Sequence, residues 1–102
     1  FTVGGHSLNH DIFSKLSKKN QEKNITESIK ILRKKLNYKI NFFSYPEGQK
    51  DHFDKHTINI LKKNKIICSP TAIFGRNSHL TNPFFLKRVM VGFNEIKLPK
   101  FD

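Results

Sequence analysis

Residues 1–10 read FTVGGHSLNH, a short apolar run that is followed by two glycines and then by two histidines. The apolar run predicts a strand that ends at the glycines. If the chain turns helical after Gly5, His6 and His10 stand four residues apart on one face, where both imidazoles can reach a single divalent cation. The alternative is a solvated turn that carries two unrelated histidines.

Two helices are predicted before residue 40. Residues 11–24 are expected to form a short helix that leads into a polar surface loop. Asn24 with Glu27 resembles a capping box, and it predicts a helix over residues 25–36 that ends at the C-cap Asn37. The apolar residues at helical spacing, expected to face a core, are Ile25, Ile29, Leu32 and Leu36.

The remainder of the chain predicts further strands around one more helix. The expected elements are a strand over 38–44, a turn over 44–48, a helix opened by Asp51 and Asp54, a strand over 65–69, a loop over 70–83 and a strand over 87–93. We expect this last helix to end at Asn64 and to bury Phe53, Thr57, Ile60 and Leu61. The resulting order β-α-β-α-β-β predicts an α/β fold with mostly parallel strands. In such folds ligands gather at the C-terminal ends of the strands, where residues 5–10 and 44–48 both lie.

The composition is that of a small, basic, folded domain. Hydrophobic residues make up 36% of the 102 residues, which excludes a disordered chain, and the net charge is +11. Such a charge favours anionic surfaces, including nucleic acid, acidic glycans and lipid headgroups. The lysines are scattered in pairs, and no aromatic residues interleave with the basic face of the helix over 25–36, so no specific nucleic-acid partner is expected.

A single cysteine, Cys68, excludes an intrachain disulfide. It lies in an apolar run, where we expect a buried, unreactive thiol. No run approaches the ~18 apolar residues needed to span a bilayer, and the N-terminus lacks the layout of a signal peptide.

Two motifs follow successive predicted strands, namely residues 5–10 (Gly-His-Ser-Leu-Asn-His) and, one helix later, residues 45–48 (Tyr-Pro-Glu-Gly). The first resembles the His-Ser/Thr-x-x-His motif of the polysaccharide deacetylases, the NodB-homology domains of carbohydrate esterase family four. The second resembles the Tyr-Pro-x-Gly form of the third motif of that family. By this resemblance, residues 1–102 are one partial (β/α) barrel domain that lacks its N-terminal part.

The resemblance also implies roles for residues of both motifs. His6 and His10 are expected to bind a divalent metal, zinc being the expected ion, and Ser7 to support the histidine turn. The backbone N–H of Glu47 is expected to stabilise the oxyanion, and its side chain to point elsewhere because a carboxylate opposes developing negative charge. The residues expected to shape the acetate pocket are Ser7, Tyr45, Pro46 and Gly48.

Other family motifs are missing from the chain. It has no Thr-Phe-Asp-Asp, the motif that supplies the general base and the third metal ligand in the family. It also lacks the late Leu-x-His motif, since His79 stands in Ser-His-Leu. Ser44 replaces the arginine that orients the base in many members, whereas residues 86–89 are loosely similar to a Leu-Pro-Arg-Ile strand. The expected function is metal-dependent N-deacetylation of an N-acetylated sugar or polysaccharide, with this chain inactive alone.

Two alternatives remain open from the sequence. His52 and His56 also stand four residues apart on a predicted helix and form a competing metal pair. In the second alternative, the chain is a small basic binding module for nucleic acid or anionic glycan, with Lys30, Arg33 and Lys34 as its basic face. The same charge suits an enzyme at an anionic membrane or envelope polymer, and the resemblance implies the bacterial cell envelope.

Overall fold

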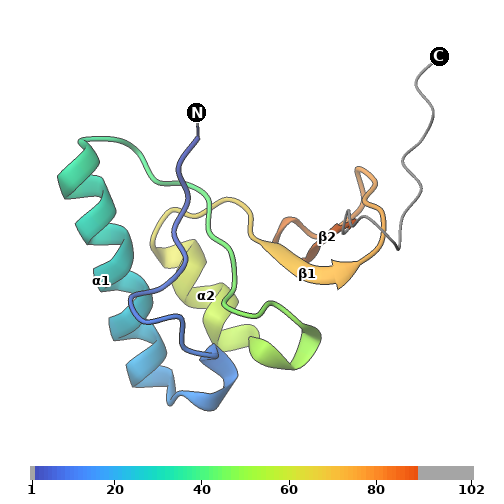
Figure 1. Ribbon diagram of the computed structural model, residues 1–102, viewed down its shortest axis with the longest axis horizontal. Helices are drawn as coiled ribbons and strands as arrows, with labels where there is room; N and C mark the ends of the chain where they lie inside the picture. The colour runs from blue at the N-terminus through green and yellow to red at the C-terminus, as the bar shows by residue number, and fades with distance from the viewer. Residues whose placement is uncertain (1, 90–102) are drawn as a thin grey trace, which may run out of the picture.

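The computed structural model describes residues 2–89 of the chain, which form two helices packed side by side and covered by extended segments (Figure 1). The helices and strands are α1 (Lys18–Leu36), α2 (Lys55–Lys63), β1 (Pro70–Phe74) and β2 (Leu86–Arg88), with three short 3₁₀ turns, η1 (Phe13–Lys15), η2 (Lys50–His52) and η3 (Pro83–Phe85). No helix in this part of the chain is long and apolar enough to cross a membrane.

Helix α1 begins earlier than predicted because Ser17, and not Asn24, is its N-cap. The hydroxyl of Ser17 accepts a hydrogen bond of 3.1 Å from the N–H of Asn20. The predicted C-cap is confirmed, since Asn37 adopts the left-handed conformation with φ 48° and ψ 47°. The short helix predicted over residues 11–24 is reduced to the turn η1 and the first part of α1.

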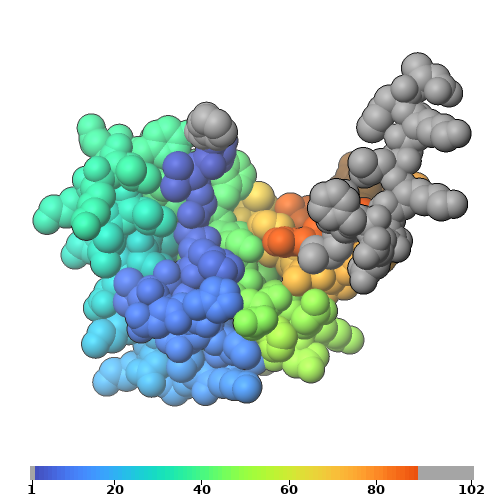
Figure 2. Space-filling view, viewed as in Figure 1, coloured from blue at the N-terminus to red at the C-terminus, as the bar shows by residue number. Residues whose placement is uncertain are grey.

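Asn24 fastens the N-terminal segment to α1. Its side chain is buried, accepts a hydrogen bond from the N–H of Leu8 at 3.1 Å, and donates one to Asp11 at 3.2 Å. The residue that resembled a helix cap in the sequence therefore holds the segment that carries the histidines. In Figure 2 this N-terminal segment, in dark blue, lies against α1.

Helix α2 is capped as the sequence predicts. The Asp54 carboxylate accepts hydrogen bonds from the N–H groups of His56 and Thr57 at 2.9 and 3.1 Å, and the Thr57 hydroxyl accepts the N–H of Asp54 at 3.1 Å. Asn64 is the C-cap. The four residues expected to be buried by this helix, Phe53, Thr57, Ile60 and Leu61, are all buried.

The core lies between the two helices and the extended segments. Ile25 and Ile29 are buried on α1, and Leu32 packs partly against the same cluster. Leu36, which was expected to face the core, is 48% exposed, because α1 extends past its partner segments there. The buried apolar residues are Phe13, Ile25, Ile29, Ile40, Phe43, Tyr45, Phe53, Ile60, Leu61, Ile66 and Phe84.

The first three predicted strands are extended segments joined by isolated parallel bridges. The bridges pair Gly5 with Phe43 and Phe42 with Cys68. The parallel direction agrees with the prediction, but no continuous strand forms. Ile40, Phe43 and Tyr45 of the middle segment are buried in the core.

The prediction of a loop over residues 70–83 is wrong for its first residues, since Pro70–Phe74 forms β1 and pairs in parallel with β2. Pro70 stands at the first position of the strand, where a missing N–H is tolerated. The strand predicted over 87–93 begins at Leu86, and residues 90–93 lie outside the described part of the chain. Cys68 is only partly buried, and its partial burial raises the pKa of the thiol.

The cap of α2 makes a testable contribution to stability. Burial alone raises the pKa of Asp54, but the hydrogen bonds from Thr57, Gln21 and His56 together outweigh it and hold this pKa below its usual value. The carboxylate therefore stabilises the fold above the unfolded pKa of about 3.9, and this contribution is lost as pH falls through the lower folded pKa.

We predict that Asp54→Ala lowers the free energy of unfolding at pH 7 by about 0.5–2 kcal/mol, and that the loss shrinks below about pH 4. Urea unfolding followed by circular dichroism measures both effects. The matched control Asp51→Ala removes an exposed carboxylate and should change stability by less than ~0.5 kcal/mol. Equal losses in the two variants would contradict the assignment of the cap.

Candidate metal centre

The segment from His6 to His10 is a turn and not a helix. Ser7 and His10 both adopt left-handed backbone conformations, with φ 74° and φ 58°. The N–H of His10 donates a hydrogen bond of 2.8 Å to the hydroxyl of Ser7, which closes the turn. The helical arrangement considered for this segment is therefore absent, yet the turn brings the two imidazole rings to a centroid separation of 4.8 Å at an angle of 62°.

The ring of His6 is oriented by the neighbouring extended segment. Its Nδ1 lies 2.7 Å from the carbonyl oxygen of Ser44, an acceptor only, so Nδ1 carries the hydrogen and Nε2 has a free lone pair. The N–H of Ser44 in turn donates to the carbonyl of Gly5 at 2.9 Å. The parallel pairing of the two segments thus sets the direction of the first histidine.

The separation of the two rings can be compared with that of two imidazoles on one metal ion. Two imidazoles bound to a tetrahedral zinc at ~2.1 Å have ring centres about 5 Å apart, close to the 4.8 Å between His6 and His10. Within residues 2–89, however, no group of three His, Cys, Asp or Glu side chains is arranged to hold a metal. The described residues therefore bring two imidazole rings together but form no complete metal site.

The loop over residues 45–48 meets the histidine turn through Glu47. The N–H of Gly48 donates to the carbonyl of Pro46 at 2.7 Å, a tight three-residue turn with Glu47 at its centre in a left-handed conformation, φ 63°. In contrast to the expectation that this side chain points away from the reacting centre, Oε1 of Glu47 lies 3.9 Å from Nδ1 of His10. The N–H of Glu47 makes no hydrogen bond to any described residue.

Gly48 fixes this loop against β1. Its φ is 78°, and an added Cβ would lie 2.8 Å from the backbone nitrogen of Ala72. The N–H of Ala72 donates to the carbonyl of Gly48 at 2.8 Å. Only glycine allows both the backbone conformation and this close approach.

Tyr45 and Pro46 lie behind the loop in the core and not on its surface. Tyr45 is 2% exposed, and its ring stacks on Phe53 with centroids 3.8 Å apart. Its hydroxyl donates to the carbonyl of Phe84 at 2.8 Å, and burial raises its pKa. In this arrangement Tyr45 supports the loop from the core.

A hollow beside His6 offers space for a ligand. It is an open groove of about 320 Å³ between the histidine turn and α1. The residues that line the groove are Gly4, His6, Ser7, Leu8, Ser28, Ile31 and Leu32. Of the two predicted site segments, only the histidine turn lines this groove, and the loop over 45–48 does not.

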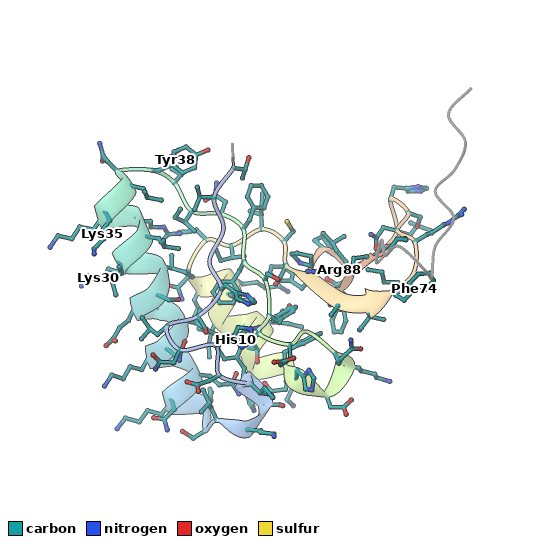
Figure 3. The ribbon with its side chains drawn as sticks, viewed as in Figure 1. His10, Lys30, Lys35, Tyr38, Phe74 and Arg88 are labelled. Atoms are coloured by element: carbon teal, nitrogen blue, oxygen red, sulfur yellow. The ribbon has the colours of Figure 1, made fainter. Side chains whose placement is uncertain are left out.

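Arg88 was not among the predicted site residues. Its Nε donates to the carbonyl of Thr71 at 2.6 Å, and its Nη2 lies 3.5 Å from the hydroxyl of Ser44, so β2 brings a guanidinium to the segment that orients His6 (Figure 3). The loose similarity of residues 86–89 to a family strand was the only signal for it in the sequence.

The competing pair is not formed. His52 belongs to η2, where its Nδ1 accepts the N–H of Gln49 at 3.1 Å, whereas His56 belongs to α2. Between them Phe53 is extended, with φ −149°. The two imidazoles therefore do not share a helix face.

Two solved structures are similar to this chain in fold. The Streptococcus pyogenes deacetylase PplD, in complex with acetate, superposes with a TM-score of 0.79 at 23% identity, over 86% of this chain and 38% of that one. IcaB from Ammonifex degensii superposes with a TM-score of 0.76 at 21% identity, over 89% of this chain and 42% of that one. This chain therefore spans about two fifths of the length of each. No curated protein sequence gives a significant match.

A sequence model of the polysaccharide deacetylases matches residues 1–68. The match contains both the histidine turn and the loop over residues 45–48, the two features that face each other in the structure. The chain belongs to the polysaccharide deacetylase family.

Proposed function

We propose that this chain carries the two-histidine part of the metal centre of a carbohydrate N-deacetylase. The single observation that carries the proposal is the 4.8 Å separation of the His6 and His10 rings, in a chain of this family. When bound, a divalent metal such as zinc would polarise the acetamide carbonyl and lower the pKa of its bound water. His6 and His10 would hold it, and Ser7 would keep the turn closed.

The free N–H of Glu47 is the proposed donor to the oxyanion. It stands at the centre of a tight turn whose neighbours Pro46 and Gly48 are buried, so the donor is held in place before substrate arrives. A fixed donor of this kind stabilises negative charge without reorganisation. We assign Pro46 and Gly48 to holding this turn and Tyr45 to supporting it from the core.

The carboxylate of Glu47 has a separate proposed role toward His10. At 3.9 Å from Nδ1 of His10 its Oε1 makes no hydrogen bond, but it places a negative charge beside the ring. Carboxylate partners of this kind orient metal-binding histidines and raise their basicity.

The substrate class is proposed to be an N-acetylated glycan. Support comes from the family and from the acetate bound to the structural neighbour from Streptococcus pyogenes. The chain contains neither Thr-Phe-Asp-Asp nor Leu-x-His, so the general base, the third metal ligand and the general acid must come from other residues. We therefore propose that residues 1–102 alone are inactive.

The histidine pair is tested by metal titration. We predict that zinc or cobalt binding, measured by calorimetry and by the cobalt absorption spectrum, is abolished by His6→Ala and by His10→Ala. His52→Ala and His56→Ala serve as matched controls and should leave binding unchanged. Loss of binding in the control variants alone would contradict the assignment.

The role of the Glu47 side chain is tested by Glu47→Gln. We predict a roughly tenfold or greater fall in zinc affinity with an unchanged circular dichroism spectrum, because the partner of His10 loses its charge. The control Glu27→Gln removes an exposed carboxylate from α1 and should have no effect. Unchanged affinity in Glu47→Gln would remove this role while leaving the histidine pair intact.

Activity of the chain itself is tested with an N-acetylated chitooligosaccharide and zinc. We predict no release of acetate above the rate without protein, because the family motif that supplies the base and the third ligand is absent from the sequence. Release that depends on zinc and is abolished by the chelator EDTA would show that this expectation is wrong.

A further inference from the structure

Five cationic side chains gather where the C-terminal ends of α1 and α2 approach each other. We call this set the basic patch; its members are Lys30, Arg33, Lys34, Lys39 and Lys65. They come from α1, from the segment after α1 and from the residue that follows the cap of α2. They line two hollows of about 490 and 480 Å³ that share Arg33, and no carboxylate lines either hollow.

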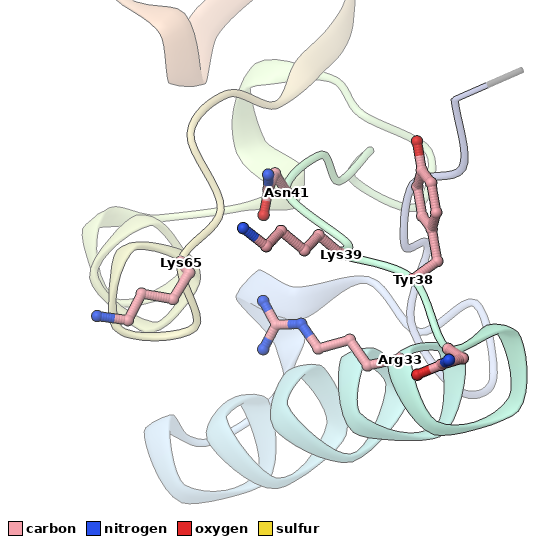
Figure 4. A pocket seen from close by; sticks show the side chains of 6 residues that line it. Arg33, Tyr38, Lys39, Asn41 and Lys65 are labelled. Atoms are coloured by element: carbon pink, nitrogen blue, oxygen red, sulfur yellow. The ribbon is translucent and has the colours of Figure 1, made fainter.

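Arg33 is held at the centre of the patch. Its Nη2 donates to the carbonyls of Ile40 at 2.9 Å and of Asn64 at 2.5 Å, which fixes the plane of the guanidinium. Its Nε and Nη1 make no hydrogen bond to the described residues. In Figure 4 the side chains of Arg33 and Lys39 extend from different segments toward the same space, with Asn41 beside them.

The backbone around the hollows is also fixed. Asn37 and Lys65 both adopt left-handed conformations, with φ 48° and φ 67°. The side chain of Asn64 donates to the hydroxyl of Thr26 at 3.2 Å and to the carbonyl of Ile60 at 2.9 Å, which joins the two helices. Hydrogen bonds between the two helices and the segment after α1 therefore hold the backbone of the patch.

The ordinary preference for cations at helix C-termini accounts for only part of this cluster. Lysines in the last turn of a helix, such as Lys34 on α1, favourably oppose the negative end of its dipole. Lys39 and Lys65 lie outside both helices. The one lysine ion pair in the described part of the chain joins Lys63 to Glu22, so no member of the patch has a carboxylate partner there.

We propose that the basic patch binds phosphate groups. A planar guanidinium with free donors, flanked by ammonium groups and by the amides of Asn37 and Asn41, suits an oxyanion with several acceptor oxygens. Two hollows on either side of Arg33 admit a ligand with two phosphates, or neighbouring headgroups of an anionic membrane. These two sources share the same chemistry and are separated by the test below.

This site is distinct from the proposed metal centre. Lys39 and Asn41 precede the extended residues that pair with Gly5, whereas Glu47 follows them, so the patch and the histidine turn lie at opposite ends of the parallel segments. Binding at the patch therefore does not depend on metal, and failure of either proposal leaves the other standing.

The test uses the 102-residue chain with two probes, pyrophosphate in solution by calorimetry and vesicles of phosphatidylglycerol or phosphatidylcholine by sedimentation. The variant Lys39→Gln/Lys65→Gln should weaken binding of the preferred probe about tenfold or more, with a smaller salt dependence. The control Lys18→Gln/Lys19→Gln removes the same charge from the first turn of α1 and should weaken binding less than ~2-fold.

Patch-dependent binding of pyrophosphate assigns a soluble phosphorylated ligand, and patch-dependent binding of phosphatidylglycerol vesicles alone assigns a membrane surface. Equal losses in the two double variants would overturn the proposal, because net charge would then explain the binding. It is also overturned if neither probe binds, or if the chain binds only a single-stranded oligonucleotide.

Discussion

The arrangement of this chain depends on the parallel pairing of Gly5 with the segment around Phe43. The N–H of Gly5 donates to the carbonyl of Phe42 at 2.8 Å, and the carbonyl of Gly5 accepts the N–H of Ser44 at 2.9 Å. A Cβ at Gly5 would lie 2.7 Å from the Phe43 ring, so the close approach of these segments requires glycine. This pairing covers the core and sets the position of the histidine turn.

The same pairing explains why the site can form without a helix. An i, i+4 helical pair would hold both imidazoles through the helix backbone alone. Here the turn is closed by Ser7, and Ser44 orients His6 from another segment. Glu47 approaches His10 from a third direction. These contacts come from separate segments of the chain, so the turn is supported by the fold as a whole.

Sequence reasoning predicted those features that rest on local chemistry. The caps at Asn37, Asp54 and Asn64 were found because small polar side chains satisfy helix ends in a recognisable pattern. The start of α1 was missed because Asn24, a residue type common at helix N-caps, makes a tertiary contact with Leu8 instead.

Features set by contacts between distant segments were harder to foresee. β1 begins at a proline in a stretch whose composition predicts a loop, and only its pairing with β2 reveals the strand. The positions of Arg88 beside Ser44 and of the Glu47 carboxylate beside His10 likewise depend on folding and leave no periodic signal. The burial of Tyr45 is of the same kind, because a tyrosine in a turn motif gives no sign of which face it occupies.

The histidine turn and its carboxylate neighbour differ in how much of the chain must be ordered to bring them together. His6 and His10 meet through a loop of a few residues, whose closure costs little chain entropy. Glu47 reaches them only after α1 and the segment that follows it have taken their places. A chain that loses this packing therefore loses both the carboxylate and the Ser44 contact that orients His6, so the strength of cation binding would report on the integrity of the fold.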